Sequence, residues 1–327
     1  MIVCVFGILI SSVALSGCFE NTENKPPVSR NYREDMRDFV QNISVYAKGI
    51  DPHFIIIPQN GQELVTDSGE PDGVPQTDYL QAIDATGREG LFYGYDNDDQ
   101  ETPEEDKQIL LDLCLIYEQF NVEVLVTDYC FTHSKMNDSY QVNEQNDFIS
   151  FAASERELNT IPEFPESPFN DNRNNITNIS QAKNFLYLIN SENFSTKQDF
   201  INAVAHTNYD LVIMDLFHDQ EAFNATEIEQ LRTKENGGKR LVICYISIGE
   251  SEDYRYYWHP EWETSSPSWL AEENPEWEGN YKVRYWDNDW QDIIFGNNNS
   301  YMKKIVDAGF DGAYLDIIDA FEYFEEQ

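Results

Sequence analysis

Basic residues are scarce in this sequence. Against 60 Asp and Glu there are only 21 Lys and Arg, which gives a formal net charge of −39 over 327 residues. A nucleic-acid-binding protein needs a basic face for the phosphates, so this charge argues against a nucleic-acid partner. The charge is explained either by a solvated acidic surface, as in adaptation to salt, or by attraction for a cationic substrate.

The motifs of several enzyme and metal-site classes are also missing. The sequence has no Gly-rich phosphate loop, no His-Glu-x-x-His and no Gly-x-Ser-x-Gly, and its five histidines lack ligand spacing. Beyond the N-terminal segment, Cys114, Cys130 and Cys244 show no Cys-x-x-Cys pair. We therefore expect no metal site and no cofactor. The three cysteines either include one disulfide or are buried free thiols.

The first residues form an apolar segment too short to span a bilayer. Residues 1–17 end in Leu-Ser-Gly, and Cys18 follows, which resembles a bacterial lipobox. We expect residues 1–17 to be a lipoprotein signal peptide, Cys18 to carry the lipid, and residues 18–34 to be a flexible tether. These features predict an extracytoplasmic protein, at the cell surface or in the periplasm, that contacts the bacterial membrane only through its lipid anchor.

From residue 35 onward, short apolar runs alternate with amphipathic segments, which is typical of a parallel α/β fold. The pattern predicts helices at 35–47, 107–120, 197–205, 226–231 and 301–308, and strands at 53–58, 90–93, 122–126, 148–152, 185–189, 211–214, 240–250, 283–286 and 313–315. Residues 153–182 are polar and linker-like. Neither half alone has enough βα units to close a barrel, so residues 35–327 are predicted to form one domain, a (β/α)8 TIM barrel.

Carboxylates stand at the ends of several predicted strands. They are Asp128, Asp215, Glu250, Asp287 and Asp316. A single aspartate in this position often caps the following helix. Because active sites of α/β barrels lie at the carboxyl ends of the strands, five such residues predict an acidic rim. Gln59 and Asn60 follow another strand, where their amides either orient ligand hydroxyls or cap the next loop.

Residues 309–324 are the most informative segment. Two glycines lead into an apolar run that delivers Asp316 and then Asp319. A carboxylate at the end of a strand buried on both faces is costly unless it faces a cleft or a partner. This segment is therefore the first candidate for chemistry.

Several long motifs carry a resemblance to a known family. They lie at 211–217 (Leu-Val-Ile-Met-Asp-Leu-Phe), 242–250, 285–287 and 309–319. Together they resemble the barrel half of glycoside hydrolase family 114, the endo-α-1,4-polygalactosaminidases. The segments 247–258 and 274–286 resemble motifs of an extracellular bacterial and archaeal branch of that family.

In that branch, counterparts of three further segments follow the one that resembles residues 309–319. Here these segments come first, at 54–61, 87–94 and 124–129. The resemblance covers residues 35–327, more weakly over 131–182. It implies a circularly permuted barrel in which Gln327 lies near Glu34.

The resemblance implies a glycoside hydrolase with two carboxyl groups, one that protonates the leaving oxygen and one that attacks or activates water. The family's pair falls on Asp316, as nucleophile or base, and on Glu89, as general acid, with the roles exchangeable. Family members have Asn-Glu-x-Cys where this chain has Gly-Arg-Glu-Gly-Leu, which leaves the substrate open. A nearby Asp319 or Asp287 would raise the pKa of the acid through like-charge repulsion.

Further residues are expected to bind sugar hydroxyls or amines. They are Gln59, Asn60, Asp128, Asp215, Tyr245, Ser247, Glu250, Asp287 and Asp319. Trp286 and other tryptophans either stack on sugar rings or pack the core. The implied partner of this monomer is a polysaccharide, with α-1,4-linked galactosamine as the candidate because its amines are cationic. Two alternatives are a surface lipoprotein that binds glycan without cleaving it and a hydrolase of a different glycan.

Overall fold

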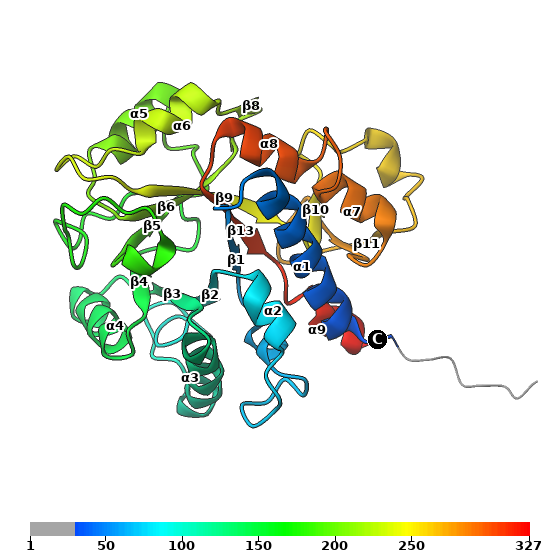
Figure 1. Cartoon of the computed structure of the whole chain (residues 1–327), viewed down its shortest axis with the longest axis horizontal. Coiled ribbons are helices and arrows are strands. Elements are labelled where there is room, and N and C mark those ends of the chain that lie inside the picture. Colours follow the sequence, from blue (N-terminus) through cyan, green and yellow to red (C-terminus); the bar gives the residue numbers. More distant parts are fainter. Residues whose placement is uncertain (1–29) are drawn as a thin grey trace, which may run out of the picture. The chain divides into compact units, whose positions relative to one another are not determined.

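Strands and helices alternate along the part of the chain that the structure describes. The computed structural model describes residues 30–327, of which Tyr32–Gln327 form one unit (Figure 1). Its helices are α1 (Tyr32–Ile50), α2 (Thr77–Ala82), α3 (Glu104–Gln119), α4 (His133–Gln145), α5 (Lys197–Ala205), α6 (Ala225–Leu231), α7 (Asn288–Ile294), α8 (Tyr301–Ala308) and α9 (Ala320–Glu325). Its strands are β1 (Ile55–Pro58), β2 (Ala85–Glu89), β3 (Glu123–Tyr129), β4 (Ile149–Ala153), β5 (Phe185–Tyr187), β6 (Leu211–Asp215), β7 (Phe217–His218), β8 (Glu221–Ala222), β9 (Leu241–Ser247), β10 (Glu250–Glu252), β11 (Leu270–Glu273), β12 (Asn280–Val283) and β13 (Gly312–Asp316).

Eight of these strands run parallel in the order expected of a (β/α)8 barrel. One sheet has the order β5-β6-β9-β13-β1, and a second has the order β2-β3-β4. A parallel bridge between Gln59 and Gly87 continues β1 against β2. At the far edges, Phe151 of β4 and Phe185 of β5 lie with ring centroids 5.7 Å apart. The mixed α/β fold with parallel sheets is therefore observed, whereas closure by a ladder between β4 and β5 stays a prediction.

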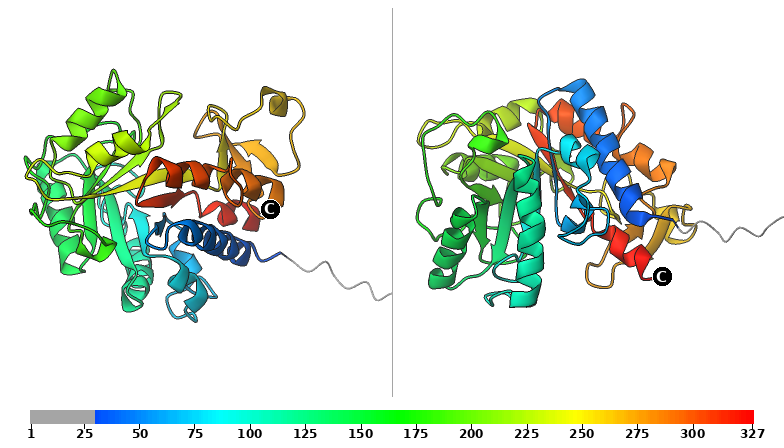
Figure 2. Two further views of the ribbon diagram at one scale, coloured as in Figure 1. Left: turned by 45° about the horizontal axis from the view of Figure 1, so that its top comes forward. Right: turned by 60° about the horizontal axis from the view of Figure 1, so that its bottom comes forward.

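The apolar runs explain why these segments are strands. Every residue of β1 and of β4 is buried, as expected for parallel strands with the barrel interior on one side and helices on the other. The helices lie on the outer side of the strands (Figures 1 and 2). The helices predicted at 197–205 and 301–308 have the same bounds in the structure.

One predicted strand lies earlier than expected. Instead of residues 90–93, the strand is β2, which ends at Glu89. The backbone turns at Gly90, where φ is 64°, a value that glycine adopts without strain. Glu89 is therefore the last residue of a parallel strand, the position at which barrel enzymes present reactive groups.

A second predicted strand, 283–286, is wrong. Its place is taken by a small antiparallel sheet with the order β10-β12-β11, in which β12 ends at Val283. Asp287 then caps α7 by accepting a hydrogen bond from the amide of Asp289 at 3.0 Å. The rings of Trp269, next to β11, and Trp290, in α7, are buried, with centroids 5.0 Å apart. Part of the tryptophan tract is therefore core packing.

Helix α4 and the stretch 153–182 also differ from a simple sequence interpretation. No helix is predicted at α4, because its sequence is mostly polar; in the structure Met136 and Tyr140 anchor it. Residues 153–182 belong to the same unit as the parallel strands, and within them the hydrogen-bonded turn 179–181 is helical. The stretch contributes to the pocket described below.

Helix α1 lies against α9 (Figures 1 and 2). Nη2 of Arg33 is 3.0 Å from Oε2 of Glu325, and the ring of Tyr32 is 5.6 Å from that of Phe324. The tether is predicted to extend over residues 18–34. Because α1 begins at Tyr32, the last three of these residues are helical instead. Strand β1, which follows α1, pairs in parallel with β13, which precedes α9.

Cys114, Cys130 and Cys244 are buried free thiols, so none of them forms the disulfide considered above. No helix within residues 30–327 is long and apolar enough to cross a membrane. The predicted signal peptide, Cys18 and most of the tether lie outside the described residues.

Candidate active site

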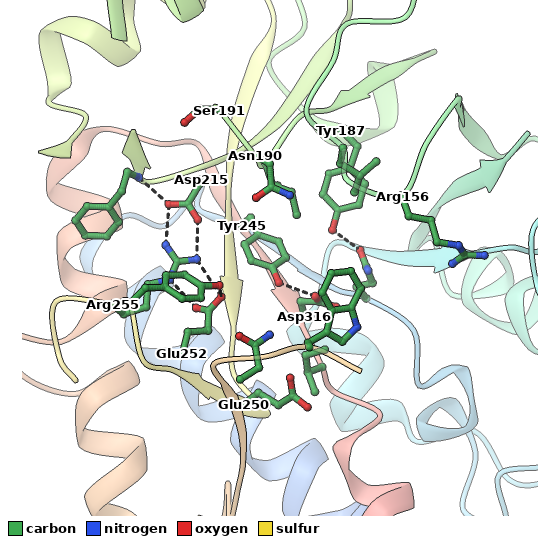
Figure 3. A pocket seen from close by; sticks show the side chains of 18 of the residues that line it. Arg156, Tyr187, Asn190, Ser191, Asp215, Tyr245, Glu250, Glu252, Arg255 and Asp316 are labelled. Carbon is green, nitrogen blue, oxygen red and sulfur yellow. Dashed lines mark hydrogen bonds and ion pairs between the residues drawn. The ribbon is translucent and has the colours of Figure 1, made fainter. Parts of the chain in front are cut away.

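One pocket lies at the carboxyl ends of the parallel strands and has a volume of about 560 Å³. The predicted site residues that line it are Gln59, Asn60, Glu89, Asp215, Tyr245, Glu250 and Asp316. Figure 3 shows Asp316 next to Tyr245, with Asp215 on one side and Arg156 on the other. The carboxyl ends of the parallel strands therefore bring seven of the predicted residues together.

Asp316 ends β13 and is in contact with Tyr245 of β9, whose hydroxyl donates a hydrogen bond to Oδ2 at 2.8 Å. Burial raises the pKa of Asp316 well above its usual range, and the negative charge of Glu89 raises it further. The next residue, Ile317, has a φ of 60°, which is rare for a β-branched side chain. A Cβ at Gly249 would collide with the carbonyl oxygen of Ile317. The glycine therefore permits the strained turn that positions Asp316.

Glu89 is held through both of its carboxylate oxygens. The hydroxyl of Tyr129 donates to Oε1, and Nδ2 of Asn60 donates to Oε2 at 3.0 Å. The neighbouring amide, Gln59, accepts a hydrogen bond from the hydroxyl of Tyr187 at 3.0 Å. The two amides thus contact pocket residues and do not serve only to cap the next loop. Glu89 has a defined orientation before any ligand binds.

Asp215 belongs to an ion cluster that the sequence did not reveal. The guanidinium of Arg255 lies 2.7 Å from Oδ2 of Asp215 and 2.6 Å from Oε2 of Glu252 (Figure 3). Burial alone would lower the pKa of Arg255, but the two carboxylates raise it well above its usual range. Arg255 and Glu252 stand inside the motif at 247–258, and the opposite charges three residues apart were the available signal. This cluster stabilises one wall of the pocket.

Arg156 lies on the opposite wall and was also missed. Its guanidinium carbon is 4.2 Å from the ring centroid of Tyr129, and its Nε is 2.6 Å from Oδ1 of Asp98. The residue stands in the stretch 153–182, which has no periodicity to indicate a site. It places a cation beside the tyrosine that contacts Glu89.

The tryptophan that lines the pocket is Trp277, not Trp286. Trp277 is 55% exposed. Trp286 instead packs against Tyr32 and Phe324, with ring centroids 5.1 Å and 4.7 Å apart. Glu250, which lines the same pocket, is held by Lys282, whose Nζ lies 2.9 Å from Oε1. The antiparallel β10–β12 sheet therefore supplies part of the pocket wall.

Residues 167–327 match the sequence model of glycoside-hydrolase family GH114.

Curated relatives resemble parts of the chain. The uncharacterized protein MJ1477 of Methanocaldococcus jannaschii is 42% identical over 158 residues, which are 47% of this chain and 43% of that protein. An uncharacterized protein of Thermotoga maritima is 37% identical over 124 residues, 38% of this chain and 37% of the relative. One of Deinococcus radiodurans is 38% identical over 126 residues, 38% of each chain. The chain thus matches less than half of the length of each of these relatives.

The GH114 match points to glycosidase chemistry in general, and the mixed α/β fold with parallel sheets is consistent with it. Within the matched residues lie Asp316, Tyr245, Asp215 and Arg255. Outside them lie Glu89, Asn60 and Tyr129, on the strands that complete the pocket. The match therefore covers one of the two candidate catalytic carboxyl groups.

Five of the predicted residues do not line the pocket. They are Asp128, Ser247, Asp287, Asp319 and Trp286. The hydroxyl of Ser247 donates to the backbone oxygen of Glu250 at 3.1 Å, and Asp287 caps α7. Burial and then the charge of Glu89 raise the pKa of Asp319 to about 6. Of the two aspartates predicted to supply a like charge, it is Asp319 whose charge raises the pKa of Asp316.

Proposed function

We propose that this protein is a glycoside hydrolase that cleaves a polysaccharide with Asp316 and Glu89 as its paired carboxyl groups. One observation carries the proposal: both groups line a single pocket at the strand ends, near enough for the charge of Glu89 to raise the pKa of Asp316. The GH114 match supports glycosidase chemistry from the half of the chain that holds Asp316. An α-1,4-linked galactosamine polymer is the proposed substrate, because the acidic pocket suits its amines.

The chemistry needs one carboxylic acid and one carboxylate. The acid donates its proton to the glycosidic oxygen as the bond from that oxygen to C1 breaks, and the carboxylate attacks C1 or takes a proton from the water that does. Tyr245 orients Asp316, and Tyr129 and Asn60 orient Glu89, so both groups are in place before the substrate arrives. Either carboxyl group can take either part. The anomeric configuration of the first product, followed by NMR, distinguishes attack on C1 from activation of water.

The first experiment compares cleavage of partly deacetylated galactosaminogalactan by the wild type, Asp316→Asn and Glu89→Gln. We expect both variants to lose cleavage while their thermal unfolding stays cooperative. Asp287→Asn is the matched control, because it makes the same chemical change outside the pocket and asparagine also caps helices. Full activity of either pocket variant would contradict the pairing.

A negative result with the wild type leads to the two alternatives. Cleavage of another polysaccharide in a panel would identify a hydrolase of a different glycan. Binding without turnover of any glycan would favour a carbohydrate-binding lipoprotein.

We also propose that the barrel is circularly permuted relative to GH114 proteins. The supporting observations are that the match covers only residues 167–327 and that α1 and α9, which flank the paired strands β1 and β13, lie side by side. A variant that joins Gln327 to Tyr32 through a short linker and opens the chain within the polar stretch 153–182 should fold and keep the activity of the wild type. Failure of this variant to fold would count against the permutation.

Finally, we propose that the protein is lipid-anchored at Cys18 outside the cytoplasm. The support is the lipobox-like sequence alone. Cys18→Ser should move the protein from the detergent phase to the aqueous phase in a partition assay. An unchanged distribution would contradict the anchor.

A further inference from the structure

One pocket wall contains a hydrogen-bond acceptor that the protein itself does not use. Glu250 lines the pocket and is 1% exposed. Its Oε1 accepts hydrogen bonds from Nδ2 of Asn274 and Nζ of Lys282, each at 2.9 Å. Its Oε2 is buried and has no hydrogen-bond partner. A buried polar atom left unpaired costs free energy, so a site that keeps one is suited to a donor from outside the protein.

Three other acidic groups that line this pocket are paired within the protein. Asp215 and Glu252 share Arg255, and Glu89 accepts from Tyr129 and Asn60. Among the pocket-lining residues, which all lie in the described part of the chain, Glu250 alone has a buried polar atom without a partner. The open acceptor is therefore a local feature of the β10–β12 wall, not a consequence of the acidic composition.

An exposed indole belongs to the same wall. Trp277 is 55% exposed and lines the pocket together with Asn280 of β12. By contrast, Trp258 stacks on Tyr281 with ring centroids 4.9 Å apart, and Trp269 is buried. A large flat side chain left uncovered beside a polar pocket offers contact area to the apolar face of a ligand ring at little entropic cost.

We infer that Glu250 and Trp277 form a subsite for one pyranose ring of the glycan. The ring lies on the indole of Trp277, and one of its hydroxyl or amine groups donates a hydrogen bond to Oε2 of Glu250. Lys282 and Asn274 are positioning residues that fix the carboxylate by its other oxygen. Because the acceptor is buried, a ring with no donor at this point leaves it unpaired and is rejected. This inference rests on the proposed function and adds the group that selects the sugar.

The subsite lies apart from the Arg156 wall. In Figure 3, Glu250 lies on one side of Asp316, and Tyr187 and Arg156 lie on the other. A ring held at Glu250 would therefore bind next to the proposed catalytic carboxyl group without occupying the space beside Arg156. The geometry leaves room for further rings of the polymer on that second side.

The test measures binding and turnover separately, with α-1,4-linked galactosamine oligosaccharides in deacetylated and fully N-acetylated forms. Binding is measured by calorimetry in an Asp316→Asn background, where turnover is prevented. We expect Glu250→Gln to weaken the Kd about tenfold or more, as for a lost hydrogen bond to a charged group. Trp277→Ala should weaken the Kd about tenfold, and Trp277→Phe should recover part of the loss.

The matched control is Glu276→Gln, which removes the same charge from an exposed residue next to Trp277 that does not line the pocket. It should leave the Kd unchanged. In the active enzyme, Lys282→Met should raise KM with little change in kcat, and Lys282→Arg should restore KM if the residue acts by positioning Glu250.

A comparison of the two oligosaccharides identifies the ligand group that donates the hydrogen bond to Oε2 of Glu250. Weaker binding of the deacetylated form alone would assign an amine, and equal weakening of both forms would assign a hydroxyl. Unchanged binding by both Glu250→Gln and Trp277→Ala, while Asp316→Asn still abolishes cleavage, would overturn the subsite and leave the proposed function standing. If the wild type neither binds nor cleaves these two oligosaccharides or any polysaccharide of the panel described above, the subsite and the proposed function both fail.

Discussion

The ends of β13 and β3 show how one sequence pattern produces two kinds of aspartate. Each end is an apolar run followed by an aspartate, Asp316 in one and Asp128 in the other. Asp128 is fully buried, and its donors are the amides of Phe92 and Tyr93, the hydroxyl of Ser139 and the side-chain amide of Asn143. Asp316 instead faces the pocket, with Tyr245 as its side-chain donor. The difference lies in how far the protein's own donors saturate the carboxylate.

The direction in which the side chain points decides whether an aspartate is saturated by the protein's own donors or faces the pocket. Successive residues of a strand point to opposite faces. In β3, Asp128 points to α4, where Ser139 lies, so the next residue, Tyr129, points into the pocket and contacts Glu89. A register shift of one residue would exchange the two positions. Asp128 therefore joins strand to helix, and Tyr129 is the residue of β3 that belongs to the site.

Asp316→Asn should show the largest effect on activity. Removal of one group of an acid–base pair costs roughly a hundred- to ten-thousandfold in rate. The free energy of unfolding should stay the same or rise, because a carboxyl group whose charged form is disfavoured by burial is replaced by a neutral amide. Initial rates and urea unfolding measure the two quantities. A large loss of stability would show that Asp316 is structural, like Asp128.

Asp128→Ala should show the opposite pattern. It leaves four donors without their acceptor, which should lower the free energy of unfolding by about 3 kcal/mol or more. The rate per folded molecule should remain near that of the wild type. Urea unfolding with the fraction folded measured in the activity buffer provides the check. A loss of kcat in fully folded protein would place Asp128 in the site after all.

Gly249→Ala should displace Asp316 without removing its carboxylate. The new Cβ would collide with the carbonyl oxygen of Ile317 and shift the turn after β13. Misplacement of a reacting group by about 1 Å can cost up to about a hundredfold in rate. Gly49→Ala is the control, because a Cβ there meets nothing within 4 Å. Equal kcat and KM for Gly249→Ala and Gly49→Ala would show that the turn after β13 does not position Asp316.

The smallest effect concerns the dependence of stability on pH. Burial, followed by the charge of Glu89, raises the pKa of Asp319 from 3.8 to about 6. Between these values the folded protein retains a proton that the unfolded chain has lost, so the free energy of unfolding falls as pH rises from about 4 to 6. Asp319→Asn should reduce this fall by an amount on the order of 1 kcal/mol. Urea unfolding at several pH values tests it, and parallel curves for variant and wild type would refute it.

The α/β architecture follows from the pattern of apolar residues along the chain. Its alternation of apolar runs and amphipathic segments predicted the parallel strands and five of the nine helices within residues 30–327. Burial on both faces of a strand and on one face of a helix leaves distinct local patterns. The sequence also placed Asp316 at a strand end. The exceptions were the helices α2, α4, α7 and α9, the strand predicted at 283–286, and β2, where the turn at Gly90 ends the ladder.

Which side chains share the pocket depends on how the strands and loops come together in space. In a strand buried on both faces the apolar residues do not alternate with polar ones, so the sequence could not tell Asp128 from Tyr129. Nor could it separate Trp277, exposed at the pocket, from Trp286, packed against α1 and α9. Arg156 comes from an aperiodic loop. These choices depend on contacts between segments far apart in the chain, and such contacts exist only once the strands have taken their register.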